Sequence, residues 1–444
     1  MDRLLSRRNF CTGATLLPAS ALLLSACGGG GSSTTDAGPQ AAALGVSAGT
    51  LDTAAPAQWA DIALRAVALA PPPGLPPHFA ARIYSMAFLA AHNALNAIAP
   101  VYASYLPTDA APGANPDAAV ATAVHDVLLN QLPFANDLLD AEYAAAIAAI
   151  RGGGSQPKGI ATGRACAAAM LAARANDGLA DIEGPFVEGT APGDYRFTPP
   201  FDFAADVNWG SAMQPFSIAK ASDYRVAAPH AVTDAAYAAD YNEVKTLGAL
   251  VGSTRTADQS ELAKFWLENT PDSWMRIALQ LAAERGMRGW GLMRALALIE
   301  IAQVDAYTAC MESKYFFHRW RPITAIRLGD SDGNALTTGD PAWTSFDPVC
   351  PPVPDYPSGH SASAGAGGVA LAAVFGGDAA SFTHQSVSLP GPTRSFTSFS
   401  QAQDEIGLSR ICVGYHFRHA VQAGIAQGRA VATQVMSTQL PARA

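Results

Sequence analysis

The chain has 444 residues, of which 49% are hydrophobic and only 15% are charged, and its formal net charge is −9. A net acidic chain of this kind argues against a nucleic-acid-binding protein and against attachment to anionic membranes by charge alone. The length exceeds one ordinary core, so we expect either one large helical unit or two fused ones.

Residues 1–26 are predicted to be an export signal that is removed from the mature protein. The segment Ser6-Arg7-Arg8-Asn9-Phe10 is typical of a twin-arginine signal. The apolar run after it is too short to span a bilayer, and it ends in Leu24-Ser25-Ala26-Cys27, the pattern of a bacterial lipobox. We therefore expect a periplasmic or cell-surface lipoprotein that is cleaved before Cys27 and lipidated on it. A cleaved signal without a lipid is the alternative.

Residues 27–49 are predicted to be a flexible tether, because they contain a Gly/Ser/Thr run. Beyond the tether, apolar residues recur at helical spacing and β-branched alternation is rare, which predicts an all-α protein. Helices are expected at residues 58–70, 80–98, 117–132, 141–151, 160–176, 233–250, 258–268, 275–314, 358–375 and 400–435. Residues 178–230 and 328–357 show no clear period and are expected to be long ordered connections.

Four cysteines lie outside the N-terminal segment, namely Cys166, Cys310, Cys350 and Cys412. An exported protein can form disulfides, but four cysteines allow three pairings and the sequence does not choose among them. Buried free thiols are an equally good expectation, because twin-arginine export delivers folded protein.

Three short segments near the C-terminus concentrate the polar chemistry of the chain. They are Lys314-Tyr-Phe-Phe-His-Arg-Trp-Arg321-Pro322, Pro357-Ser358-Gly359-His360 and Ser409-Arg410-Ile-Cys-Val-Gly414-Tyr-His416. Their Lys and Arg side chains can neutralise the oxygens of phosphate or vanadate. A Ser-Gly step at a helix start adds backbone N–H groups and the positive end of the helix dipole. Two histidines can divide the roles of ligand or nucleophile and proton transfer.

The segments thus predict a site for a tetrahedral or trigonal oxyanion. Lys314 and Arg321 are seven residues apart, so one helix end could aim both side chains inward if Pro322 closed that helix.

The order K-x6-RP, PSGH and SR-x3-G-x-H resembles the signature of the vanadium-dependent haloperoxidase and type 2 phosphatidic acid phosphatase superfamily. Residues 81–98, 237–245 and 305–314 are similar to the bacterial haloperoxidase-like branch. The resemblance implies two fused helical bundles with the anion site in the C-terminal one. We accordingly expect an N-terminal helical half with its long connection over residues 50–230 and a C-terminal helical domain over residues 231–440.

The resemblance also implies a role for each site residue and a vanadate cofactor. His416 would bond to vanadium, and His360 would be the acid–base. The vanadate oxygens would be held by Lys314, Arg321, Ser358, Gly359 and Arg410. The implied activity is oxidation of a halide by hydrogen peroxide to a hypohalous species, with a small organic acceptor and no nucleic-acid partner. Contact with a membrane is expected only through the lipid anchor.

Three positions depart from the family pattern. Ala420 stands where a carboxylate would orient the second histidine, and Val353 and Met311 stand where well-known haloperoxidases have an aromatic residue or histidine. The last two leave the halide preference open. The remaining histidines are expected to be structural or to lie near the site without contacting the anion; they are His78, His92, His125, His230, His318, His384 and His419.

Two other functions compete with the haloperoxidase. A soluble acid phosphatase could use the same residues, with His416 as nucleophile and His360 as general acid, but the absence of a carboxylate at Ala420 favours vanadate. A non-catalytic anchored lipoprotein is disfavoured, because no cation or histidine of the site has been lost. Zinc-protease, P-loop and serine-hydrolase motifs are absent.

Overall fold

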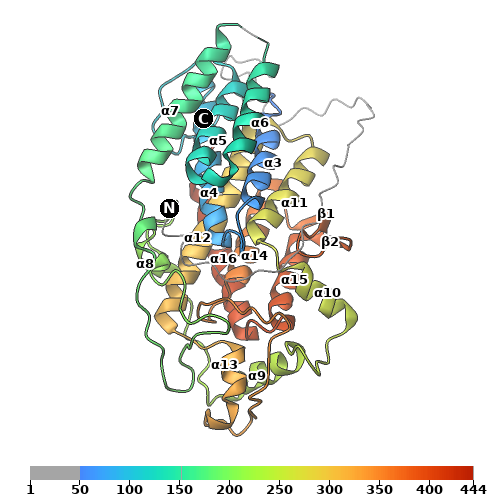
Figure 1. Cartoon of the computed structure of the whole chain (residues 1–444). Coiled ribbons are helices and arrows are strands. Elements are labelled where there is room, and N and C mark those ends of the chain that lie inside the picture. The colour runs from blue at the N-terminus through green and yellow to red at the C-terminus, as the bar shows by residue number, and fades with distance from the viewer. Residues whose placement is uncertain (1–50, 152, 444) are drawn as a thin grey trace.

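The computed structural model describes residues 51–151 and 153–443 (Figure 1). The predicted export signal, the tether over residues 27–49 and the lipidation site Cys27 lie outside the described residues. Within them, no helix is long and apolar enough to cross a membrane, and Cys166, Cys310, Cys350 and Cys412 are all buried free thiols.

The N-terminal half is a group of helices drawn in blue to green in Figure 1. They are α3 (Ala55–Ala68), α4 (Pro77–Ile98), α5 (Pro116–Gln131), α6 (Asn136–Ala149) and α7 (Ser155–Ala173). All five predicted helices of this half are confirmed, with ends shifted by a few residues. The starts of α4 and α5 follow from local chemistry, since both carry proline in the first turn and Asn115 caps α5 through its side chain.

The rest of the chain adds the helices that carry the three polar segments. They are α8 (Trp209–Ala212), α9 (Ala235–Leu247), α10 (Ala257–Phe265), α11 (Thr270–Glu284), α12 (Gly289–Phe317), α13 (Pro322–Arg327), α14 (Gly359–Phe375), α15 (Phe399–Cys412) and α16 (Arg418–Thr438). Helix α12 packs against α4 on one side and against α14 and α16 on the other, so it joins the two halves.

Two of the predicted helices are wrong, because the structure divides each of them into two helices. The expected helix over residues 275–314 is divided into α11 and α12 by a turn in which Gly286 and Gly289 have φ of 65° and 54°. The expected helix over residues 400–435 is divided into α15 and α16 at Gly414, whose φ is 87°. Apolar residues continue at helical spacing through both turns, so periodicity alone does not reveal the positive φ that ends each helix.

One β-hairpin was missed by the sequence analysis. Strands β1 (Ala379–Gln385) and β2 (Thr393–Ser398) pair antiparallel, and Phe382 faces Phe396 with ring centroids 5.3 Å apart. Buried and exposed residues alternate along β1, as expected for a strand with one covered face. Apart from this hairpin, the regular secondary structure of the described residues is helical, which confirms the all-α class; the predicted domain boundaries stay a prediction.

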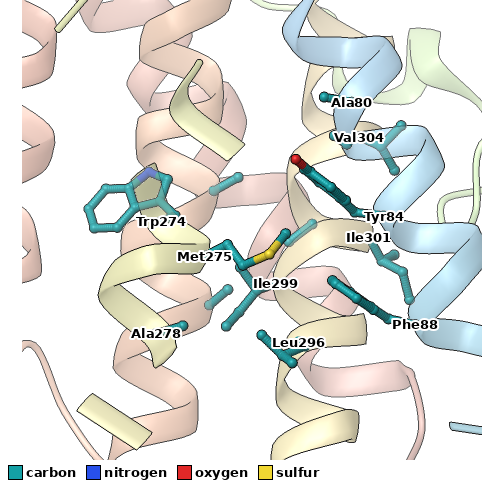
Figure 2. Packing of buried hydrophobic residues seen from close by; sticks show 14 of the residues in the cluster. Ala80, Tyr84, Phe88, Trp274, Met275, Ala278, Leu296, Ile299, Ile301 and Val304 are labelled. Atoms are coloured by element: carbon teal, nitrogen blue, oxygen red, sulfur yellow. The ribbon is translucent and has the colours of Figure 1, made fainter. Parts of the chain in front are cut away.

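The core is continuous between the two halves. One cluster of buried apolar residues includes members of α3 to α5, of α11 and α12, and of α14 to α16. Figure 2 shows a central part of it, where Tyr84 and Phe88 of α4 face Leu296 and Ile301 of α12, and Met275 of α11 reaches toward them. Burial of such side chains stabilises a fold by about 1.5–3 kcal/mol each.

Glycines allow α14 and α16 to touch through their backbones. A Cβ on Gly428 would lie 1.8 Å from the carbonyl oxygen of Ala362, and one on Gly365 would lie 2.4 Å from that of Ile425. Since real Cβ atoms do not approach so closely, larger residues at these positions would push the helices apart. The two helices are therefore closely packed behind the Ser358–Gly359–His360 step.

A buried ion cluster fixes the start of the long connection over residues 178–230. Asp177 accepts hydrogen bonds from Arg82 Nε at 2.8 Å and from Arg174 Nε at 3.0 Å, and all three residues are buried. Farther along, the carboxylate of Asp305 on α12 accepts the backbone N–H groups of residues 216–218. The connection is therefore ordered, as predicted, and its backbone is held by side chains of α4 and α12.

Candidate active site

The structure brings the seven predicted site residues together at one end of the C-terminal helices. Lys314 lies in the last turn of α12 and Arg410 in the last turn of α15. Ser358 caps α14, which begins with Gly359 and His360. His416 lies in the turn between α15 and α16, and Arg321 precedes α13.

The placement of Lys314 and Arg321 on one helix end is wrong. Helix α12 ends at His318, which has a positive φ of 49°, and Arg321 then adopts an extended conformation as the residue before α13. Pro322 therefore begins α13 instead of closing α12, a position that proline favours because its missing N–H is not needed there. The two cations converge from opposite sides of this break.

The three cations of the site are almost completely buried. Lys314 is 2% exposed, and Arg321 and Arg410 are each 1% exposed. Their partners are mainly carbonyl oxygens: Lys314 Nζ donates to Pro354 O at 2.6 Å, and Arg410 Nη2 donates to Trp266 O at 2.5 Å. Within residues 51–151 and 153–443, no carboxylate side chain accepts a hydrogen bond from any of the three. Buried charge without an ionic partner is unfavourable, so this arrangement favours a bound anion.

The same burial is visible in the pKa values. Loss of water lowers the pKa of Lys314 to about 7 and that of Arg410 to about 10. The charge of Arg321 acts in the same direction on Lys314. An anion among the cations would oppose both effects and favour the protonated lysine.

The histidine at position 416 has a defined orientation. Its Nδ1 lies 2.7 Å from Asp355 Oδ1, and its Nε2 lies 3.0 Å from Arg321 Nη1. Burial, followed by the charges of Arg321 and Lys314, holds the pKa of His416 well below its usual range. The ring is therefore neutral near pH 7, with Nδ1–H donating to the carboxylate and the Nε2 lone pair directed toward the cations. A metal ligand needs such a lone pair.

Asp355 was missed by the sequence analysis. It is 1% exposed, and burial raises the pKa of its carboxyl to about 7. The expected carboxylate position, Ala420, is fully buried and offers no polar atom, so the partner of His416 comes from a different segment. The available signal was a single acidic residue in the Pro-rich run three residues before Ser358.

The start of α14 provides the accessible part of the site. Gly359 and His360 are partly exposed, whereas the cations behind them are buried. Ser358 Oγ accepts from the N–H of Ser361 at 3.4 Å and thus caps the helix. The ring of Tyr307 lies against Gly359, where a Cβ would be 3.3 Å from Tyr307 Cε1. The backbone N–H groups of this first turn are the donors that an oxyanion would meet.

His360 and Arg410 are both oriented by the segment of residues 266–268. His360 Nε2 lies 3.3 Å from Glu268 O, and burial followed by the charge of Arg410 holds the pKa of His360 well below its usual range. The Glu268 carboxylate is bound by His384 of β1 at 2.5 Å and by Arg276 at 2.7 Å. The hairpin therefore helps to fix the backbone that contacts two site residues.

The two unusual positions near the site share an apolar wall. Met311 belongs to a small buried cluster with Phe79 and Trp209, and Val353 packs against that cluster. The ring of His78 lies edge-on to Trp209 with centroids 4.3 Å apart, and its Nε2 lies 3.2 Å from Asp206 Oδ2. Met311 and Val353 are not aromatic, and the aromatic rings of this wall are those of Phe79 and Trp209.

Other histidines make structural contacts. His92 Nε2 lies 3.0 Å from Ala103 O, and His125 lies between two aspartates. The rings of His230 and His419 stack with centroids 3.9 Å apart. This stack lines a cavity of about 20 Å³.

The comparisons with known proteins agree with this geometry. The family model described as the VCPO second helical-bundle domain matches residues 294–440. The vanadium chloroperoxidase of Curvularia inaequalis is 38% identical over 81 residues, which are 16% of this chain and 13% of the relative. The match thus covers only a small part of that protein.

Solved structures match over most of the chain. The structure described as the first bacterial vanadium-dependent iodoperoxidase superposes with a TM-score of 0.74 at 24% identity, covering 88% of this chain and 96% of the other. A holo-type bacterial vanadium-dependent chloroperoxidase superposes with a TM-score of 0.68 at 18% identity, covering 82% and 92%. Residues 294–440 therefore match the model of the VCPO second helical-bundle domain, and the described chain shares the fold of these solved haloperoxidase structures.

Proposed function

We propose that the protein is a vanadate-dependent haloperoxidase that oxidises a halide with hydrogen peroxide to a hypohalous species. One observation carries the proposal: three buried cations without a carboxylate hydrogen-bond partner lie near a neutral histidine whose Nε2 is 3.0 Å from one of them, Arg321. This combination suits an oxyanion whose central atom also accepts a nitrogen ligand. The similarity to haloperoxidase structures supports the same choice.

The donor set fits vanadate. Lys314, Arg321 and Arg410 would hold its oxygens by charge, and Ser358 with the N–H of Gly359 would add neutral donors. His416 would provide the nitrogen ligand through Nε2. When bound, vanadate supplies the centre that makes peroxide electrophilic toward a halide.

His360 is placed to move a proton. Its ring is neutral near pH 7 and lies at the partly exposed start of α14, between solvent and the buried cations. A neutral imidazole can accept a proton from an incoming peroxide and later return it. The proposed reaction partners are hydrogen peroxide, a halide and a small organic acceptor of the hypohalous product.

The test is a parallel assay of anion-free, vanadate-loaded and phosphate-loaded protein. Each form is given peroxide with iodide, bromide or chloride, and separately a phosphoester. We expect peroxide-dependent halide oxidation only after vanadate loading. Efficient phosphoester hydrolysis without any halide oxidation would contradict the proposal.

An acid phosphatase is the second candidate, and the contact between Asp355 and His416 favours it. A phospho-histidine mechanism needs a carboxylate that orients the nucleophilic imidazole, and Asp355 supplies one at 2.7 Å. The absence of a carboxylate at position 420 therefore does not exclude phosphatase chemistry, because Asp355 substitutes for it. The assay above separates the two activities.

We further propose that the protein is exported by the twin-arginine pathway and anchored through lipid on Cys27. The support is the sequence of residues 6–10 and 24–27. Labelled fatty acid should enter the wild-type protein and be absent from Cys27→Ser. Equal labelling of both proteins would contradict the anchor.

A further inference from the structure

We propose that Asp355 is the positioning residue for His416, and that it performs in this chain the task of the carboxylate expected at position 420. The inference rests on the proposed function in one respect, namely that His416 binds the central atom of an oxyanion through Nε2. It assigns a role to a residue outside the three polar segments.

The contacts of Asp355 support this assignment. Its Oδ1 lies 2.7 Å from His416 Nδ1, where a carboxylate is placed to accept Nδ1–H. Its backbone carbonyl accepts from Lys314 Nζ at 3.0 Å, and its backbone N–H donates to Arg319 O at 2.8 Å. One residue thus connects the histidine, a cation of the site and the segment that leads to Arg321.

The hydrogen bond determines which ring nitrogen is available. A neutral imidazole carries its proton on one nitrogen only, and an acceptor beside Nδ1 keeps the proton there. Nε2 then keeps its lone pair and lies 3.0 Å from Arg321 Nη1, on the side of the cations. Without the carboxylate, the ring can rotate or carry its proton on Nε2, and its lone pair no longer faces the cations.

Positions 355 and 420 lie next to each other. The N–H of Ser358 donates to Ala420 O at 2.9 Å, which joins the segment of Asp355 to the first turn of α16. Both Asp355 and Ala420 line the cavity of about 20 Å³, together with Arg319 and His419. Such a cavity has room for about one water molecule. A carboxylate at either position would border this cavity, and two carboxylates in so small a space would repel each other.

The geometry predicts that the effect of Ala420→Asp depends on residue 355. In the wild-type background the new carboxylate meets Asp355, so Ala420→Asp should bring no gain in anion affinity. In the Asp355→Ala background it can enter the space that the substitution opens, because residue 420 lies in the first turn of α16, four positions after His416. Ala420→Asp should then restore the anion affinity that Asp355→Ala removes.

The experiment compares wild type, Asp355→Ala, Asp355→Asn, Ala420→Asp and the double variant Asp355→Ala/Ala420→Asp. The affinities for orthovanadate and for inorganic phosphate are measured by calorimetry, with the thermal midpoint of each variant as the folding control. The pH profile of halide oxidation is recorded beside them. In the anion-free protein, ¹⁵N spectra of labelled histidine report which nitrogen of His416 is protonated, and His416→Ala assigns the signal.

We expect Asp355→Ala to weaken vanadate binding about 10- to 100-fold, the usual effect of removing such a partner. The double variant should recover to within about threefold of wild type. Asp355→Asn should lose less vanadate affinity than Asp355→Ala, because an amide oxygen still accepts a hydrogen bond from Nδ1–H. An unchanged affinity in folded Asp355→Ala, or a folded double variant no better than Asp355→Ala, would overturn the proposal.

Failure of the proposed function gives a different result. If wild-type protein oxidises no halide while phosphate affinity and the His416 tautomer depend on Asp355 as described, the positioning role holds and the haloperoxidase assignment falls. If halide oxidation is present but neither the phosphate affinity nor the His416 tautomer changes in the Asp355 variants, the positioning role alone is wrong. Should Asp355→Ala not fold, Asp355→Asn and the double variant carry the test.

Discussion

Two buried clusters of cationic side chains occur in this molecule, and their partners differ. In the cluster of Arg82, Arg174 and Asp177, both guanidinium groups donate directly to one carboxylate. In the site, Lys314 and Arg410 donate to carbonyl oxygens, and the carboxylate of Asp355 contacts His416 instead. Burial is similar in the two places, with exposed fractions of 4% or less.

The difference shows how a stabilising cluster and a binding site can be told apart. A buried arginine that touches a carboxylate has its counter-charge inside the fold, and removing one partner leaves the other uncompensated. A buried cation that touches only carbonyl groups still lacks a counter-charge, and a ligand can provide it. The first cluster should therefore act on stability, and the second on anion binding.

The largest expected effect separates two buried histidines. His416→Ala should reduce vanadate binding and vanadate-dependent halide oxidation at least about a hundredfold, because it removes the nitrogen ligand. His92→Ala removes a buried histidine of α4 that contacts a backbone carbonyl, so it should lower the thermal midpoint and leave vanadate affinity unchanged. Full activity in vanadate-loaded His416→Ala would refute the ligand assignment.

The second prediction compares the cations themselves. Arg82→Met should lower the free energy of unfolding by about 2 kcal/mol, because the buried hydrogen bonds from Arg82 to Asp177 and Gln131 are lost while Arg174 still pairs with Asp177. Lys314→Met should cost no more than about 1 kcal/mol in anion-free protein, because it removes a cation whose pKa burial has already lowered. Denaturant unfolding of both variants gives the comparison, and equal losses would mean that the two clusters do not differ.

The third prediction is stabilisation by the anion. At a free vanadate concentration 100 times the dissociation constant, binding should add about 2.7 kcal/mol to the free energy of unfolding. Arg82→Met should keep this increment and Lys314→Met should lose most of it. Thermal unfolding with and without vanadate measures both, and an equal increment in Lys314→Met would exclude Lys314 from the site.

The smallest effect is a dependence on pH. The pKa values of Lys314 and Asp355 are both about 7 in the anion-free site, and a bound anion raises both. Binding therefore takes up protons as the pH rises through 7, and affinity should fall by up to about 1.4 kcal/mol per pH unit for each proton taken up. Sulfate is the suitable probe, since its own charge is constant from pH 6 to 9. An affinity that rises with pH would contradict the prediction, because binding would then release protons.

Much of the site could be predicted from the sequence because its residues lie in short segments. Each segment holds its polar residues within nine positions, and the ends of α12, α14 and α15 carry them to the same place. Local spacing therefore selected residues that the fold brings together, even though it placed Lys314 and Arg321 on one helix. The roles assigned to these residues by resemblance remain predictions until variants are measured.

The features that the sequence did not reveal depend on contacts between distant segments. Asp355 meets His416 across 61 residues, and neither position shows this by itself. The turn at Gly414 interrupts a regular apolar pattern because its backbone lies against Gly248, where a Cβ on Gly414 would be 2.6 Å from the carbonyl oxygen. The hairpin β1–β2 is short, and its burial depends on Phe399 and other residues that fold around it.

The apolar wall of Phe79, Trp209, Met213 and Met311 divides the surroundings of the site between two parts of the chain. Every cation and both site histidines come from residues after 313, whereas Phe79 and Trp209 precede them by more than a hundred positions. Mutations in the N-terminal half can therefore reshape one side of the site without moving a charge. Two traits are thus separable: the affinity for the anion, and the discrimination among molecules that approach it. Selection can adjust them independently within one gene.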